Sequence, residues 1–152
     1  WATSARNDIV SALNAGKSLT VYTGHSAISS WSQNGLLTSS LINGGLLSAS
    51  APTALLQIGC YGTYFVEPTT NSLAASLLST AGGVAVMVGT TGLTEVEDGA
   101  NLATAFLTGV RDQQSVGESL RRAQSDILGR EPTMLDIVIG SNVLGDPTLN
   151  LR

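Results

Sequence analysis

The chain has 152 residues, of which 43% are hydrophobic and 12% are charged, and its net charge is −4. A chain of this length buries roughly 70% of its unfolded surface and is too apolar to be disordered, so we expect residues 1–152 to form a single domain or the C-terminal part of one. Frequent Gly, Ser and Thr interrupt the apolar runs, which argues against a membrane span, and the seven basic residues form no continuous track for nucleic acid.

Helix and strand patterns alternate along the whole chain. An amphipathic start that ends at Gly16 predicts a first helix. The apolar periodicity after it predicts, in order, a strand at 18–24, a short helix at 34–47, a strand at 54–59, a helix at 72–81, a strand at 84–89, helices at 100–110 and 116–128, and a strand at 136–140, with a short edge segment in the tail 144–151. Strands that alternate with helices form right-handed βαβ units, so the predicted fold class is α/β, with a mostly parallel sheet covered on both faces.

The only histidine and the only cysteine stand at equivalent places in this pattern. His25 directly follows the strand at 18–24, and Cys60 directly follows the strand at 54–59. Reactive groups of open α/β sheets gather outside the carboxyl ends of the strands, and a single helical crossover allows these two strands to be neighbours. We therefore expect His25 and Cys60 to face one cleft. A structural interpretation competes, since a lone Cys is often a small buried hydrophobe and a lone His a loop residue.

A cysteine and a histidine in one cleft supply the chemistry of peptide hydrolysis. The Cys60 thiolate attacks, and the His25 imidazole protonates the departing amine near neutral pH. The backbone amides of Cys60 and Ser26 are candidates to hold the developing oxyanion, at about 3 kcal/mol for each donor. This reaction needs no cofactor, and one Cys with one His provides no metal site of the usual spacing and no internal disulfide.

Four segments resemble those of gingipain-type cysteine peptidases, in the same order. YTGHSAISSW at 22–31 is similar to their histidine motif, and LLQIGCYGTYF at 55–65 is similar to their cysteine motif. VAVMVGTTG at 84–92 resembles their next strand, and VLGDPTLNL at 143–151 resembles the close of their catalytic domain. The resemblance implies a caspase-like three-layer sandwich and a cysteine endopeptidase that acts on a protein or peptide substrate, with Cys60 as nucleophile and His25 as the catalytic histidine.

The chain departs from this family in two respects. Gly usually follows the catalytic His, where this chain has Ser26; if that position required φ > 0, a Ser would be strained there and the oxyanion hole impaired. Such domains also begin with strands and helices that precede the histidine strand, so we expect a sheet that is incomplete on its N-terminal side and a partner fragment that completes it.

The beginning and the composition of the chain bear on its processing and location. The chain opens at Trp1 without Met and without the features of a signal peptide, which indicates a processed product or a fragment. The Lys-poor, Ser- and Thr-rich composition favours an extracellular or cell-surface location.

Three alternatives stay open. CHAT-type caspase-like domains share the dyad, and GESLRRAQ at 117–124 resembles one of their helices. A catalytically silent peptidase-like domain that binds protein or serves as structure is compatible with Ser26 and the absent strands. A serine esterase would use Ser26 within GHSAI, although its triad needs a distant His and the only His is adjacent. NAGKS at 14–18 precedes a strand instead of following one, which argues against a phosphate loop.

Acidic and aromatic residues near the predicted cleft are candidates for substrate binding. Glu95 and Glu97, with Asp98, follow the third strand on the catalytic side and would attract an Arg or Lys of a substrate; alternatively, they are solvated acids before the positive end of the next helix. Trp31 either lines the cleft or anchors its loop on the core. Asp146 in GDPT is expected to fix a turn rather than to bind calcium.

Overall fold

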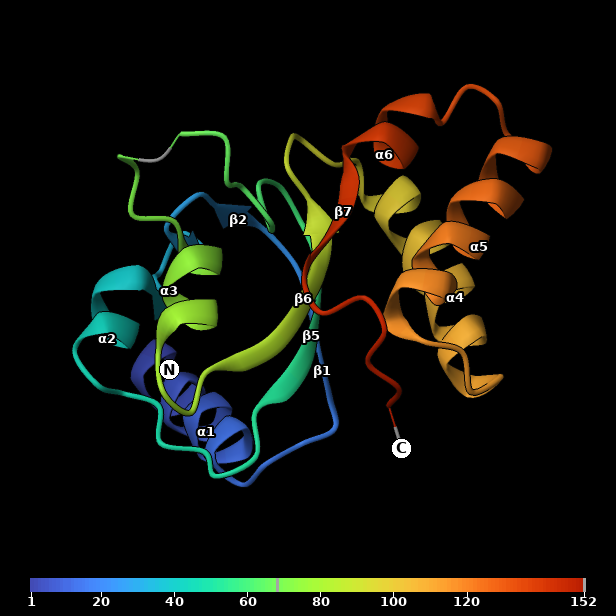
Figure 1. Ribbon diagram of the computed structural model, residues 1–152. Coiled ribbons are helices and arrows are strands. Elements are labelled where there is room, and N and C mark those ends of the chain that lie inside the picture. The colour runs from blue at the N-terminus through green and yellow to red at the C-terminus, as the bar shows by residue number, and fades with distance from the viewer. Residues whose placement is uncertain (68, 152) are drawn as a thin grey trace.

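The computed structural model describes residues 1–67 and 69–151. Its centre is a four-stranded sheet in the order β1-β5-β6-β7 (Figure 1). The strands are β1 (Leu19–Thr23), β5 (Thr53–Ile58), β6 (Val84–Thr90) and β7 (Ser141–Gly145). β1, β5 and β6 are parallel, and β7 is antiparallel to β6. The sheet is therefore mostly parallel, and the first three predicted strands are confirmed.

Helices cover both faces of this sheet, as Figure 1 shows. One layer consists of α1 (Ala2–Asn14), α2 (Ser39–Asn43) and α3 (Leu73–Ser79), and the other of α4 (Val96–Arg111), α5 (Val116–Arg130) and α6 (Leu135–Gly140). The fold is an open three-layer α/β sandwich, as the sequence predicts. Within the described residues, no helix has the length and apolarity that crossing a membrane requires.

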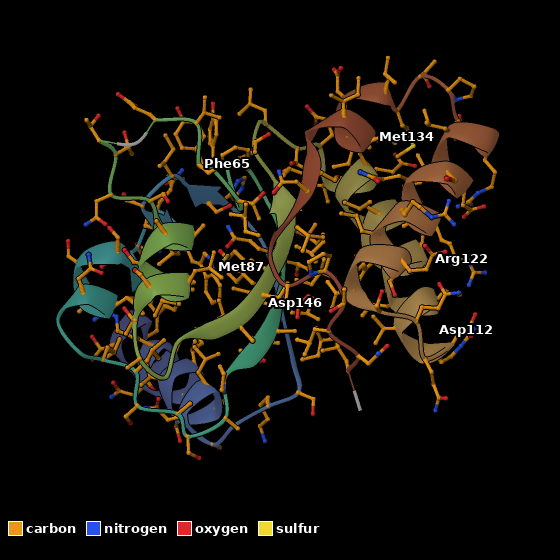
Figure 2. The ribbon with its side chains drawn as sticks, in the orientation of Figure 1. Phe65, Met87, Asp112, Arg122, Met134 and Asp146 are labelled. Carbon is orange, nitrogen blue, oxygen red and sulfur yellow. The ribbon has the colours of Figure 1, made fainter. Side chains whose placement is uncertain are left out.

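Alternation along the central strands divides the core into two halves. All six residues of β5 are buried. Leu55 packs with Met87 on the side of α3, where Figure 2 labels Met87. Leu56 packs with Val88 and Phe106 on the side of α4 and α5. Successive side chains of a strand point to opposite faces, so a strand covered on both faces must be apolar along its length. This requirement explains why the central strands are recognisable in the sequence.

The prediction of a strand at 136–140 is wrong. Leu135–Gly140 is the short helix α6, and β7 begins only at Ser141. The run DIVIG is apolar and β-branched, but a run this short is ambiguous between helix and strand, and tertiary packing decides. Two of its apolar residues pack in the core while Ile139 is 73% exposed. The helix reverses the chain at the carboxyl end of β6, so that β7 returns antiparallel to it.

A second sheet, which the sequence pattern does not predict, follows β1. The strands β2 (Ser26–Ala27), β3 (Ser30–Trp31) and β4 (Leu37–Thr38) form an antiparallel sheet. Strands of two residues have too little periodicity to be recognised in a sequence. The helix predicted at 34–47 is confined to α2, because the Thr38 side chain caps its start and Gly44 caps its end.

The tail after β7 packs against α5 through backbone contacts. Asn150 forms an isolated antiparallel bridge with Ser115, and the N–H and Oγ1 of Thr148 donate to Asp146 Oδ1 over 2.8 and 2.7 Å. These hydrogen bonds hold the pKa of Asp146 below its ordinary value. The prediction that Asp146 fixes a turn is confirmed.

Candidate active site

The carboxyl ends of β1 and β5 bring His25 and Cys60 to the same end of the sheet. Each residue of β1 pairs with the residue 35 positions later in β5, as Thr23 does with Ile58, and His25 and Cys60 have the same separation. The N–H of Gly24 donates to the Ile58 carbonyl over 3.1 Å, so the parallel pairing continues beyond the strands. Neighbouring strands lie about 4.8 Å apart, and the two loops therefore start side by side.

The histidine loop (residues 24–26) and the cysteine loop (residues 59–63) are in direct contact. Ser26 Oγ donates a hydrogen bond to the carbonyl oxygen of Cys60 over 2.7 Å. Gly59 lies so close to the histidine loop that a Cβ atom there would stand 2.4 Å from the Gly24 carbonyl oxygen and 2.5 Å from Ser26 Oγ. Only glycine fits this position, because it alone has no Cβ.

A well-supported hairpin carries His25, whose side chain is exposed. The His25 carbonyl accepts hydrogen bonds from the Ser32 N–H and from Tyr22 Oη, both at 2.7 Å. The Tyr22 ring stacks on Trp31 with centroids 4.1 Å apart, and Trp31 Nε1 donates to Gln57 Oε1 over 2.8 Å. Burial raises the pKa of the Tyr22 phenol, which therefore stays protonated and donates throughout the neutral range. The backbone on either side of His25 is thus held in place.

The loop between β6 and α4 holds the cysteine loop from the other side. The half-buried Cys60 thiol donates to the Thr94 carbonyl over 3.9 Å. The Tyr61 N–H donates to the Gly92 carbonyl over 2.8 Å. Tyr61 has φ 57°, in the left-handed region that costs a non-glycine residue about 1–2 kcal/mol. Backbone strain directly after a candidate nucleophile persists only where such contacts enforce it.

Among the described residues, the backbone amides of Ser26 and Cys60 have no hydrogen-bond acceptor, which leaves them available to a ligand. Ser26 is extended within β2 and its φ is not positive, so the strain considered for a residue replacing Gly is absent. Hydrogen-bonded and non-hydrogen-bonded pairs alternate in an antiparallel ladder. Because His25 and Ser32 share a hydrogen bond, Ser26 and Trp31 form the non-hydrogen-bonded pair, and the Ser26 N–H points away from β3. In the part of the chain that the structure describes, the Cys60 N–H has no backbone acceptor.

The three candidates for substrate binding differ in exposure. Trp31 is only 2% exposed and packs on the core, which favours the anchoring interpretation over the cleft-lining one. Glu95 and Glu97 are exposed at the start of α4, and Glu95 follows Thr94, the residue whose carbonyl contacts Cys60. Acids at this end of a helix also favour its dipole, so both interpretations of the pair are compatible with the structure.

Gly59 and Thr90 support the site, and the sequence analysis singles out neither of them. Thr90 Oγ1, at the end of β6, donates to the Gly59 carbonyl over 3.0 Å and is 2.6 Å from Thr94 Oγ1. The signal for Gly59 was present, since a glycine at a strand end often marks a close approach of two backbones. No sequence signal distinguishes Thr90 from the many other threonines, because its role depends on the strand order.

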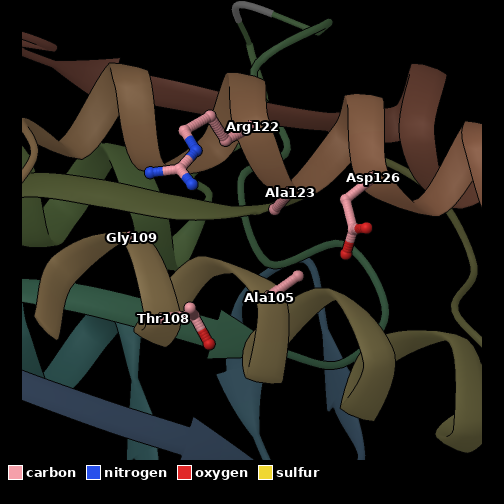
Figure 3. Close-up of a pocket in the computed structure, with 6 residues that line it drawn as sticks. All are labelled: Ala105, Thr108, Gly109, Arg122, Ala123 and Asp126. Carbon is pink, nitrogen blue, oxygen red and sulfur yellow. The ribbon is translucent and has the colours of Figure 1, made fainter. Parts of the chain in front are cut away.

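A separate hollow of about 190 Å³ opens between α4 and α5 (Figure 3). These two helices lie on the opposite side of the sheet from α3 (Figure 1). It is lined by Ala105, Thr108, Gly109, Arg122, Ala123 and Asp126. Its charged residues pair with neighbours on the helices, Arg122 with Asp112 and Asp126 with Arg130. The hollow contains neither the cysteine nor the histidine, and it is not the site described above.

The fold and the site together define a caspase-like α/β protein that carries a histidine and a cysteine at the ends of adjacent parallel strands. The family model of peptidase family C25 matches residues 1–152, and the chain belongs to that family. The gingipain-type resemblance is thereby confirmed. A comparison with curated protein sequences gives no match.

Solved structures share the fold over nearly the whole chain. The crystal structure of the Arg-specific cysteine proteinase gingipain R is 16% identical, with 97% of this chain and 36% of that chain covered and a TM-score of 0.78. The complex of the pro- and mature domains of RgpB from Porphyromonas gingivalis is 16% identical, covering 97% and 37%, with a TM-score of 0.83. A structure titled as a protease is 13% identical, covering 93% and 37%, with a TM-score of 0.75. This chain thus spans little more than a third of the length of each structure that it resembles.

Proposed function

We propose that this chain is the catalytic part of a cysteine endopeptidase in which Cys60 and His25 form the dyad. The observation that carries the proposal is the contact between the two loops, in which Ser26, next to His25, donates to the Cys60 carbonyl over 2.7 Å. Two residues whose neighbours touch, at the ends of adjacent parallel strands, can reach one scissile bond. Membership in peptidase family C25 supports the same class of reaction.

Acylation begins when the Cys60 thiolate attacks the carbonyl carbon of the scissile peptide, so that a C–S bond forms and the carbonyl electrons move onto oxygen. The tetrahedral intermediate then collapses, the C–N bond breaks, and the His25 imidazolium gives its proton to the departing amine. In deacylation, His25 takes a proton from a water molecule that attacks the thioester, and Cys60 leaves as thiolate. Neither half-reaction needs a cofactor.

The amides of Ser26 and Cys60 are the proposed donors to the oxyanion. The Ser26 N–H points away from β3, and the Cys60 N–H has no backbone acceptor among the described residues. The two amides belong to the two loops that flank the scissile bond in this mechanism. Each such donor is worth about 3 kcal/mol in the transition state. A backbone donor depends on the local conformation and not on the side chain, so Ser26 serves this role as well as the usual Gly does.

Glu95 and Glu97 are proposed to bind a basic residue of the substrate. They are exposed beside Thr94, which contacts the Cys60 thiol. Val96, between the two acids, is 84% exposed, and Leu93, two residues before Glu95, is 76% exposed. Both offer apolar contact to the aliphatic stem of an Arg or Lys. Gingipain R, which shares the fold, is Arg-specific.

A partner segment is proposed to pair with the outer edge of β1. In the described part of the chain, β1 is an edge strand of the main sheet. An edge strand exposes backbone donors and acceptors that proteins usually pair or cover. The fold-related RgpB has been solved as a complex of its pro- and mature domains, so a second segment on this fold has a precedent. The composition supports an extracellular or cell-surface location for the assembly.

Chemical labelling of the intact protein tests the dyad against its alternatives. Cys60 is expected to react with iodoacetamide at about pH 6–7 faster than an unfolded-peptide thiol, and His25→Ala is expected to remove that advantage. Cys60→Ala is expected to abolish peptide hydrolysis, while a fluorophosphonate leaves Ser26 unlabelled.

The alternatives give different outcomes in the same experiment. Alkylation of Cys60 no faster than in the unfolded peptide, with no hydrolysis, identifies a catalytically silent binding or structural domain. Labelling of Ser26 together with full activity of Cys60→Ala identifies a serine esterase. Either result overturns the cysteine peptidase proposal.

A further inference from the structure

The peptide unit between Cys60 and Tyr61 is held at both of its polar groups. Its carbonyl oxygen accepts from Ser26 Oγ over 2.7 Å, and its N–H donates to the Gly92 carbonyl over 2.8 Å. The two partners belong to different loops, one after β1 and the other after β6. Because the peptide group is planar, these two bonds together fix the rotation of the whole unit.

This peptide unit needs support from its surroundings. Tyr61 has φ 57°, a conformation that a non-glycine residue keeps only when the structure enforces it. Among the hydrogen bonds of the described residues, the one from Ser26 Oγ is the only one that the Cys60 carbonyl accepts. The orientation of this peptide plane sets ψ of Cys60 and hence the direction in which the thiol is presented. Loss of the Ser26 hydroxyl therefore loosens the backbone at the nucleophile.

The Ser26 side chain and Gly59 fit each other. A Cβ atom on Gly59 would stand 2.5 Å from Ser26 Oγ, so the hydroxyl occupies space that the glycine leaves open. Ser26 itself is held within β2, opposite the buried Trp31. The hydroxyl is consequently presented to the Cys60 carbonyl from a fixed strand.

We propose that Ser26 is a positioning residue: its hydroxyl fixes the orientation of the Cys60–Tyr61 peptide and thereby the direction in which the Cys60 thiol points. The inference rests on the proposed function, and it is distinct from the oxyanion role of the Ser26 amide, which every residue type except proline retains at this position. At this position the resembled histidine motif has Gly, which cannot make the bond.

Two variants and one matched control, each in the intact protein, test the positioning role. Ser26→Ala and Ser26→Gly keep the backbone amide and remove the hydroxyl. Ser29→Ala makes the same chemical change in the turn of the same hairpin, where the exposed serine hydroxyl makes no hydrogen bond to the described residues. Both Ser26 variants are expected to lower kcat roughly tenfold, the equivalent of one hydrogen bond, with KM within about twofold of wild type. Exchange of the Tyr61 amide, followed by NMR, is expected to accelerate about tenfold, and Ser29→Ala should change neither quantity.

Wild-type kcat in Ser26→Ala overturns the proposal, and so does unchanged exchange of the Tyr61 amide in both Ser26 variants. A rise in KM with unchanged kcat also overturns it, because the hydroxyl would then act on substrate binding. If the intact wild-type protein hydrolyses no peptide, the proposed function fails on its own. The Tyr61 exchange rate then still decides whether Ser26 holds this peptide.

Discussion

Replacing Gly59 with Ala tests whether contact between the histidine and cysteine loops maintains the site. The added Cβ would lie 2.4 Å from the Gly24 carbonyl oxygen and 2.5 Å from Ser26 Oγ. Non-bonded atoms pack at about 3.5 Å, so the two loops must separate by about 1 Å. The Ser26–Cys60 hydrogen bond, 2.7 Å in the native structure, then exceeds the length at which it contributes.

Two costs follow from this separation. Overpacking of this kind lowers the free energy of unfolding by about 1–3 kcal/mol. A displacement of about 1 Å between reacting groups lowers kcat/KM about 100-fold. The loss of activity is therefore expected to exceed the loss of folded protein, which urea denaturation and kinetics on the same preparation measure together.

Gly129→Ala is the matched control for this substitution. A Cβ at Gly129, in the last turn of α5, meets nothing within 4 Å. Ala there is expected to raise the stability by about 0.5–1 kcal/mol and to leave the activity unchanged. A Gly59→Ala variant with the stability and the kcat/KM of wild type would refute the reasoning, because the loops would then not need their contact.

Further predictions concern the histidine hairpin and the acids at α4. Tyr22→Phe removes a donor to the His25 carbonyl and is expected to lower the free energy of unfolding by about 1 kcal/mol in urea denaturation. Because burial raises the pKa of Tyr22 in the folded state, its contribution to the free energy of unfolding is complete below about pH 10 and is lost as the pH rises through the folded-state pKa. If the difference in free energy of unfolding between wild type and Tyr22→Phe does not narrow above about pH 10, this prediction is contradicted. Joint replacement of Glu95 and Glu97 by Gln is expected to raise KM for an Arg-containing peptide about fivefold without changing kcat. Glu67 is also exposed, and the control variant Glu67→Gln is expected to change neither KM nor kcat. An unchanged KM in the double variant contradicts a role of these acids in binding basic substrates.

The part of the fold that positions the candidate site could be predicted because it depends on buried strands. β5 and β6 consist mostly of buried apolar residues, and such runs separated by helices define parallel strands with a common carboxyl end. Cys60 comes just after β5, which is a strand of this kind, and His25 comes just after β1, an edge strand whose residues are half-buried or exposed. The pairing of β1 with β5 then needs only one crossover between them.

The remainder depends on contacts between residues far apart in the chain. The helix α6 has the same apolar, β-branched composition as a strand, and only its packing with residues of α4 and α5 distinguishes it. Trp31 is buried because Tyr22 and Gln57 contact it, and neither partner is recognisable from local pattern. The hydrogen bond from Ser26 Oγ to the Cys60 carbonyl likewise requires the register of two strands before it can be anticipated.

The kinetics of a double-mutant cycle test most directly whether His25 and Cys60 act as one site. The measured quantity is kcat/KM of the intact protein, of His25→Ala, of Cys60→Ala and of the double variant. Groups that act as a unit are strongly non-additive, so His25→Ala is expected to lose at least about 100-fold, Cys60→Ala to be inactive, and the double variant to be no worse than Cys60→Ala. Wild-type activity in either single variant would contradict the account.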